Sequence, residues 1–168
     1  IVSGSKDGTI RIWEFKTGSI VSSNAVFDND NRSIYFGSFD THFYAISLEG
    51  KILWKFKTGG IIASSPVIKD GIIYFGSSDY NFYAVDAKTH CELWRFRTGD
   101  EIVSDPVIIN NRIYFGSMDN FFYCVGLDGS LIWKFRTNAA ILLGPAAYNE
   151  NALYFGSVDE HLYAVDFN

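Results

Sequence analysis

The sequence predicts an all-β protein built from repeated units, and three observations lead to this prediction. Tyr-Phe-Gly-Ser recurs at steps of 39 or 40 residues, at 35–38, 74–77, 114–117 and 154–157. Trp-x-Phe-x-Thr recurs at a similar step, beginning at Trp13, Trp54, Trp94 and Trp133. No segment shows the 3.6-residue periodicity of a helix over ten or more residues. Repeats of about 40 residues without helices are typical of a β-propeller, in which each repeat forms one four-stranded antiparallel blade.

Each unit is expected to contain four short strands joined by tight turns. In the third unit, β-branched and aromatic residues place the strands at roughly 104–109, 112–117, 121–126 and 130–136. Asp70-Gly71 and Asn110-Asn111 suit hairpin turns because these residues tolerate positive φ. Glu49-Gly50 and Asp128-Gly129 suit the hairpin between the third and fourth strands. The four units cover approximately 19–57, 60–97, 100–136 and 139–166.

The last unit contains only three of the four expected strands, at roughly 143–148, 152–157 and 161–166. Residues Thr9–Phe15 carry the pattern of a fourth strand, so we expect them to complete this blade and close a four-bladed ring. An eight-bladed ring shared by two chains is the alternative. Residues 1–5 are then a surplus strand, which suggests excision from a longer propeller or strand exchange between two chains. Residues 1–168 therefore form one propeller domain or a propeller fragment.

Composition excludes several classes of protein. The chain has 168 residues, of which 48% are hydrophobic and 20% charged, so it can bury the core of one domain. Its net charge of −5 argues against a nucleic-acid partner, which favours a basic protein. No apolar run approaches the 18 residues of a membrane span. Cys91 and Cys124 fit neither a disulfide framework nor a metal motif, and we expect two buried free thiols.

Four motifs resemble the pyrroloquinoline-quinone-like (PQQ-like) β-propeller repeats, also called tryptophan-docking repeats. They are Ile-Tyr-Phe-Gly-Ser (73–77), Phe-Tyr-Ala-Val-Asp-Ala-x-Thr (82–89), Leu-Trp-Arg-Phe-Arg-Thr-Gly (93–99) and Ser-Asp-Pro-Val (104–107). The resemblance covers roughly 13–168, with His90 and Asn138 standing where the family has glycine. It implies an extracytoplasmic location. It also implies blade docking by Trp13, Trp54, Trp94, Trp133, Gly37, Gly76, Gly116 and Gly156.

An aspartate follows the glycine of each Tyr-Phe-Gly-Ser motif by three residues. We expect its side chain to cap an Asx-type turn by accepting backbone N–H groups. A ring of functional carboxylates is the alternative, but the repeat symmetry keeps the copies away from the axis and apart from one another. These predicted turn-capping residues are Asp40, Asp79, Asp119 and Asp159.

Three further sets of residues are candidates for function. Small or polar residues at the start of the innermost strands are expected to line the central axis: Ser23, Ser65, Asp105 and Gly144. A cation lies three residues after each tryptophan: Lys16, Lys57, Arg97 and Arg136. We expect these cations to protect an outer edge strand from pairing. The alternative is a basic circlet that attracts an anionic polymer or membrane headgroups. Two histidines at equivalent turns are expected to be solvated rather than metal ligands: His42 and His161.

These observations favour a non-catalytic binding or scaffolding module within a larger protein, with a protein or peptide as partner and no cofactor. The connections between blades are short, and no nucleophile elbow or phosphate-binding loop occurs. The resemblance leaves one enzymatic alternative, a fragment of a quinoprotein dehydrogenase that uses PQQ and calcium. Val2–Trp13 resembles a WD40 repeat, so a WD40-like interaction hub is a third possibility. Ring sharing would make the protein a homodimer.

Overall fold

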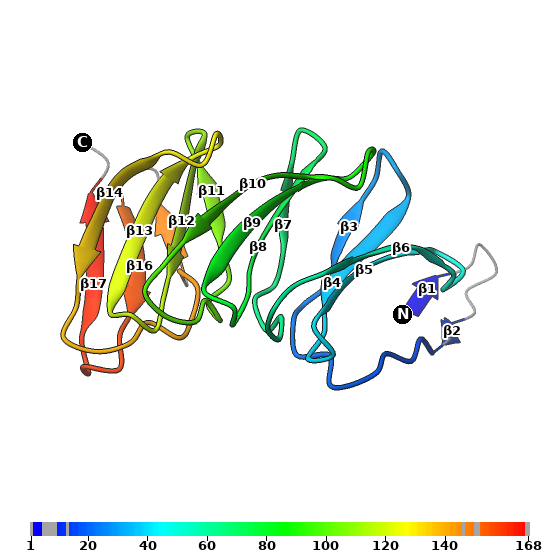
Figure 1. The fold of residues 1–168 in the computed structure, drawn as a ribbon, viewed down its shortest axis with the longest axis horizontal. Coiled ribbons are helices and arrows are strands. Elements are labelled where there is room, and N and C mark those ends of the chain that lie inside the picture. The colour runs from blue at the N-terminus through cyan, green and yellow to red at the C-terminus, as the bar shows by residue number, and fades with distance from the viewer. Residues whose placement is uncertain (1, 5–9, 13, 146, 150–151, 167–168) are drawn as a thin grey trace.

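A computed structural model describes residues 2–4, 10–12, 14–145, 147–149 and 152–166 (Figure 1). The regular structure of these residues consists of β-strands, and no helix occurs among them. In chain order the strands are β1 (Val2–Gly4), β2 (Ile10–Ile12), β3 (Val26–Asp28), β4 (Ser33–Gly37), β5 (His42–Ser47), β6 (Ile52–Lys57), β7 (Val67–Lys69), β8 (Ile72–Gly76), β9 (Asn81–Asp86), β10 (Glu92–Arg97), β11 (Val107–Ile109), β12 (Arg112–Gly116), β13 (Phe121–Gly126), β14 (Leu131–Arg136), β15 (Ala147–Asn149), β16 (Ala152–Gly156) and β17 (Leu162–Asp166).

The strands form successive antiparallel sheets in simple up-and-down order. Blades 1, 2 and 3 are the four-stranded sheets β3–β6, β7–β10 and β11–β14, and blade 4 is the three-stranded sheet β15–β17. This arrangement confirms the predicted all-β, bladed fold. The turn before β8 has positive φ at Asp70 and Gly71, and the turn before β12 has it at Asn110 and Asn111, as their residue types predict.

The innermost strands are shorter than expected, with three residues each. The strand placed at 104–109 begins only at Val107, directly after Pro106. Proline has no N–H to donate to a ladder, and the two residues before it form contacts other than strand pairs. The innermost strand of blade 4, expected at 143–148, likewise runs from Ala147 to Asn149.

The expected closure of the ring within the chain is wrong for the residues described. β2 pairs with β1, with Val2 opposite Ile12 and Gly4 opposite Ile10, and β16 is the one described strand that pairs with β17. β1 and β2 lie at the opposite end of the row of blades from β17 (Figure 1). A hairpin between neighbouring strands costs much less loop-closure entropy than pairing across the whole chain. The residues that we predicted to form a surplus strand, 1–5, therefore include β1, the partner of β2.

The core lies between the blades, and the same contact occurs at each junction. A phenylalanine from the third strand of one blade stacks on a phenylalanine from the second strand of the next blade. The ring centroids lie 4.3 Å apart for Phe43–Phe75, 4.2 Å for Phe82–Phe115 and 3.8 Å for Phe122–Phe155. Because both faces of an inner blade are covered, its strands are apolar on both sides.

Candidate functional site

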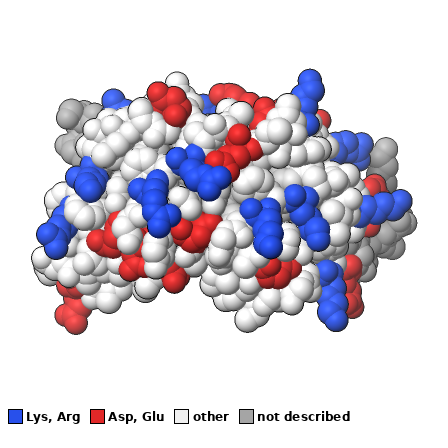
Figure 2. Space-filling model, in the orientation of Figure 1, with Lys and Arg blue, Asp and Glu red and all other residues white. Residues whose placement is uncertain are grey.

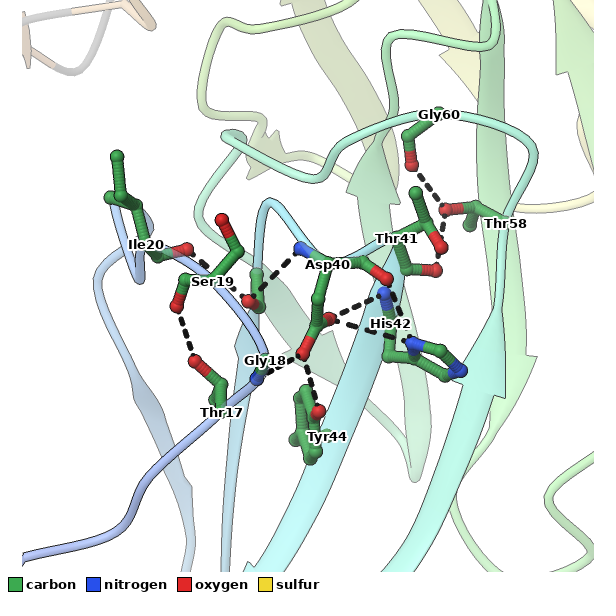
Figure 3. A network of polar contacts seen from close by, with 11 residues as sticks. Thr17, Gly18, Ser19, Ile20, Asp40, Thr41, His42, Tyr44, Thr58 and Gly60 are labelled. Carbon is green, nitrogen blue, oxygen red and sulfur yellow. Dashed lines mark hydrogen bonds and ion pairs between the residues drawn. The ribbon is translucent and has the colours of Figure 1, made fainter.

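The aspartate of blade 1 is the centre of a polar network (Figure 3). Asp40 Oδ2 accepts hydrogen bonds from the Gly18 backbone N–H at 2.8 Å and from the Tyr44 hydroxyl at 2.6 Å. Its Oδ1 accepts the His42 backbone N–H at 3.0 Å, which caps the turn between β4 and β5. Gly18 belongs to the segment before blade 1, so this one carboxylate joins that segment, a turn and a strand.

The same three kinds of donor surround the equivalent aspartates. Asp79, Asp119 and Asp159 accept backbone N–H groups from the preceding connection, from Gly59, Gly99 and Asn138 respectively. They also accept N–H groups within their own turns, and hydroxyl groups from Tyr83, Tyr123 and Tyr163. Asn138 makes this contact with its backbone N–H, so this hydrogen bond is kept where asparagine replaces the family glycine.

Hydrogen bonding sets the protonation state of these groups. Burial alone would raise the pKa of Asp79, but the hydrogen bonds from Tyr83, Gly59 and Asn81 outweigh it and lower that pKa. The pKa of Asp40 is lowered for similar reasons, and that of Asp159 falls to about 2. Burial and the neighbouring Asp40 carboxylate raise the pKa of Tyr44 to about 12. Such carboxylates are weak bases, and their oxygens are already occupied by donors from the protein.

Three of the four predicted docking glycines lie against an isoleucine of the connection to the next blade. A Cβ added to Gly37 would lie 2.2 Å from Ile62, one at Gly76 would lie 2.3 Å from Ile102, and one at Gly116 would lie 2.1 Å from Ile141. A side chain at these positions therefore displaces the neighbouring connection. Gly156 differs, because an added Cβ there meets no atom of the other described residues within 4 Å.

The tryptophans of blades 1 and 2 contact the next blade. Trp94 donates its Nε1–H to the Leu127 backbone oxygen at 3.0 Å and lies against Gly129. Trp54 instead stacks on His90, with ring centroids 5.0 Å apart. The histidine that departs from the family pattern therefore becomes a docking surface, a role that its sequence position alone did not reveal.

Among the described residues, Trp133 of blade 3 shows no contact of this kind with a turn of the next blade. Trp133 packs on Tyr114 and Phe122 of its own blade and lines a groove of about 330 Å³ between β14 and β17. Phe155, Tyr163 and Val165 line the opposite side of this groove. Trp13 lies outside the described residues.

Three of the four predicted axial residues lie around one cavity of about 300 Å³: Ser65, Asp105 and Gly144. The Ser65 backbone N–H donates to Asp105 Oδ1 at 2.6 Å, and the Asn24 N–H donates to Ser65 Oγ at 2.8 Å. The prediction for Ser23 is wrong by one position. Its buried hydroxyl bonds to the backbone of Gly37, and Asn24 lines the cavity instead.

The outermost strands carry six exposed cations, which we call the cation belt: Lys55, Lys57, Arg95, Arg97, Lys134 and Arg136. Of the predicted set, Lys16 is also exposed but precedes these strands. Five of the six cations lie over aromatic rings, the closest being Lys134 at 4.2 Å from the Phe121 ring centroid. Among the described residues only Arg95 of the belt forms an ion pair, with Glu92 at 2.7 Å.

The remaining candidates are placed as follows. His42 and His161 each direct Nδ1 to the backbone oxygen of the aspartate two residues earlier. Cys124 is buried as expected, and burial raises its thiol pKa, but Cys91 is exposed, which corrects the expectation for that residue. The described residues contain no group of three or more histidine, cysteine or acidic side chains placed to hold a metal ion. None of them lies in a helix that is long and apolar enough to cross a membrane.

A family model described as "Outer membrane protein assembly factor BamB" matches residues 4–104. These residues contain blades 1 and 2 and the docking motifs described above. The chain belongs to this PQQ-like repeat family. No curated protein matches the chain.

Two solved structures show the same fold, and both are computationally designed propellers. The Ika4 protein is 15% identical with a TM-score of 0.78, and the match covers 91% of this chain and 94% of Ika4. The Ika8 protein is 17% identical with a TM-score of 0.79, and the match covers 99% of this chain and 55% of Ika8. The bladed architecture therefore matches both designed structures over more than nine-tenths of this chain.

Proposed function

We propose that this chain is a non-catalytic propeller module that binds an extended acidic segment of a protein partner along the cation belt. The observation that carries the proposal is a set of exposed positive charges: five of the six lie over aromatic rings, and among the described residues all but Arg95 form no ion pair. An aromatic ring orients a cation without cancelling its charge, whereas a carboxylate would do both. The family model names an assembly factor for proteins, which supports a protein as the partner.

The spacing of the belt suits an extended partner. Lys55 and Lys57 lie two residues apart on one strand and so project from the same side, about 7 Å apart. An extended peptide with acidic residues at every second position has the same spacing and can pair with both cations. The equivalent pairs on β10 and β14 repeat this arrangement.

The surrounding charge favours a narrow partner. Figure 2 shows Lys and Arg in a row across the middle of this face, with Asp and Glu gathered above and below the row. A peptide that follows the row meets mainly cations, with Glu92 beside Arg95 as an acidic neighbour, while a flat anionic surface also meets the carboxylates above and below the row. We therefore favour an acidic segment over a membrane surface.

The non-catalytic part of the proposal rests on the aspartates. All four phased carboxylates accept hydrogen bonds from the protein on both oxygens. A carboxylate whose two oxygens both accept hydrogen bonds from the protein serves to hold the blades together. The competing dehydrogenase function is tested by adding PQQ and calcium and supplying an alcohol with a redox dye. Reduction of the dye would overturn the non-catalytic assignment.

Binding is tested with a fluorescent oligo-glutamate peptide of about a dozen residues, which spans about 40 Å when extended. The variant Lys57→Gln/Arg97→Gln/Arg136→Gln is compared with Lys51→Gln/Lys69→Gln/Lys88→Gln, which removes equal charge away from the belt. We expect the belt variant to bind about tenfold more weakly, since three exposed charge pairs at about 0.5 kcal/mol each amount to that factor. The control is expected to bind like the original protein.

Two outcomes contradict the proposal. Equal loss in both variants would mean that overall charge, not the belt, governs binding. Belt-dependent binding to vesicles of phosphatidylglycerol and phosphatidylcholine, without peptide binding, would assign the surface to a membrane instead.

A further inference from the structure

The outer face of blade 4 carries an empty socket. At Gly37, Gly76 and Gly116 the space above the glycine is filled by an isoleucine that is fully buried. At Gly156 no heavy atom of the described residues, its two chain neighbours aside, comes within 4 Å of an added Cβ. The socket is bordered by Leu143 and Val158, which are large apolar side chains exposed to solvent.

The neighbouring strand shows the same lack of cover. Leu162 of β17 occupies the position that Phe122 has in blade 3, since each pairs with the glycine that ends the preceding strand. Phe122 is fully buried against blade 4, whereas Leu162 is 73% exposed. Blade 4 thus presents an apolar face of the kind that is covered at every other junction.

The opposite end of the chain presents the missing side chain. Ile62, Ile102 and Ile141 each lie four residues after the threonine of a Trp-x-Phe-x-Thr motif. Val21 holds the same position after Thr17 but is 46% exposed, and Ile20 beside it is 62% exposed. Val21 is therefore a β-branched side chain of the right kind that has not entered a socket.

The segment before Val21 has the geometry of an outermost strand of a preceding blade. Phe15 lies edge-on to Phe36 and Tyr44, with ring centroids 5.9 and 5.6 Å apart. Phe56 of β6 contacts Phe75 and Tyr83 of the next blade at 6.2 and 5.5 Å in the same manner. The Gly18–Asp40 hydrogen bond completes the match to Gly59–Asp79. A segment in this position is the outermost strand of a blade, and it pairs there with the third strand. In blade 4 the third strand is β17, and no described strand lies along its outer edge.

We propose that the chain binds a second copy of itself head to tail, with Val21 of one copy in the Gly156 socket of the other. Residues 14–18 of the first copy then lie along β17 of the second, over the aromatic groove at Trp133. A second copy is the occupant because this chain presents both halves of the junction with the repeat's own register. The two patches differ, so the contact is heterologous, and two such contacts close a ring if the rotation permits.

The proposal is tested by sedimentation of the 18.9 kDa chain across the micromolar range. The original protein is expected at twice this mass. Gly156→Val fills the socket, and because an added Cβ there meets nothing, this variant is expected to fold as a single chain. Val21→Asp places a charge on the inserting side chain and is also expected to remain a single chain. Leu53→Asp, at a position equally exposed on the outermost strand β6, is the control and is expected to keep the doubled mass.

A mixture of the two interface variants decides the geometry. Gly156→Val retains an intact Val21, and Val21→Asp retains an intact socket, so together they are expected to restore the doubled mass. The proposal is overturned if the original protein sediments as a single chain, if the mixture stays single, or if Leu53→Asp also dissociates. The belt variant is expected to keep the doubled mass, so failure of peptide binding is distinct from failure of this contact.

Discussion

At the scale of single residues, the repeated carboxylates explain why the blades hold together. Each phased aspartate accepts one N–H from the connection before its blade, one from its own turn and one hydroxyl from its own third strand. The charged acceptor makes these bonds stronger than bonds between neutral groups. Its recurrence at one phase therefore reflects a structural requirement of every blade.

Replacing Asp79 with alanine is expected to destabilise the protein by about 2–3 kcal/mol. The substitution removes a charged acceptor and leaves the Tyr83 hydroxyl and the Gly59 N–H without their partner. Asp70→Asn is the control, because that side chain is exposed, its distance to Lys69 is 4.0 Å, and asparagine tolerates the positive φ of this turn. Urea unfolding followed by circular dichroism measures both variants. Equal midpoints for the two would contradict the role given to Asp79.

The same carboxylates predict how stability depends on pH. The pKa of Asp159 is about 2 in the folded chain, and those of Asp40 and Asp79 are also lowered, against an unfolded value of about 3.9. A lowered folded pKa contributes stability that is complete above the unfolded value and is lost as pH falls through the folded one. We therefore expect the melting temperature to fall between about pH 4 and pH 2. Asp159→Asn should make that fall less steep, and an unchanged slope would argue against the hydrogen-bonded carboxylate.

At the scale of elements, the tryptophans of blades 2 and 3 differ in what they contact. Trp94→Ala removes the packing of the indole on Gly129 of the next blade and leaves the Leu127 oxygen without its donor, at an expected cost of about 3 kcal/mol. Trp133→Ala removes packing on Tyr114, Phe122 and the core cluster that includes Phe155, but no hydrogen bond like that of Trp94, and it opens an existing groove, so a smaller cost is expected. Chemical denaturation of both variants tests the difference. A cost for Trp133 equal to that for Trp94 would contradict docking as the source of stability.

The sequence predicted the blades well because the signals for them are local. Hairpin turns such as Asp70-Gly71, alternating strands and the phased aspartates all act within one unit. The register at the axis was predicted less well, because Ser23 and Asn24 are both small polar residues and only tertiary contacts distinguish them. The role of His90 as the surface that Trp54 stacks on depends on the neighbouring blade, and so does the empty space at Gly156.

At the scale of the whole molecule, the blades of the described residues form an open row and do not pair into a closed ring. Closure depended on pairing between residues far apart in the sequence, and the local β1–β2 hairpin competes with it. The sequence pattern of 9–15 showed which strand type was present but not which edge it would cover. The exposed apolar side chains at the two ends follow from this open arrangement.

Amide hydrogen exchange of β17 in a dilute, single-chain sample tests the open arrangement most directly. β13 has a strand on both edges, whereas within the described part of the chain β17 has one neighbour, β16. Alternate residues of an antiparallel strand bond to opposite neighbours, so about half of the β17 amides are expected to exchange rapidly while those of β13 stay protected. Protection of β17 equal to that of β13 would mean that the chain covers this edge itself, and would contradict the open row of blades.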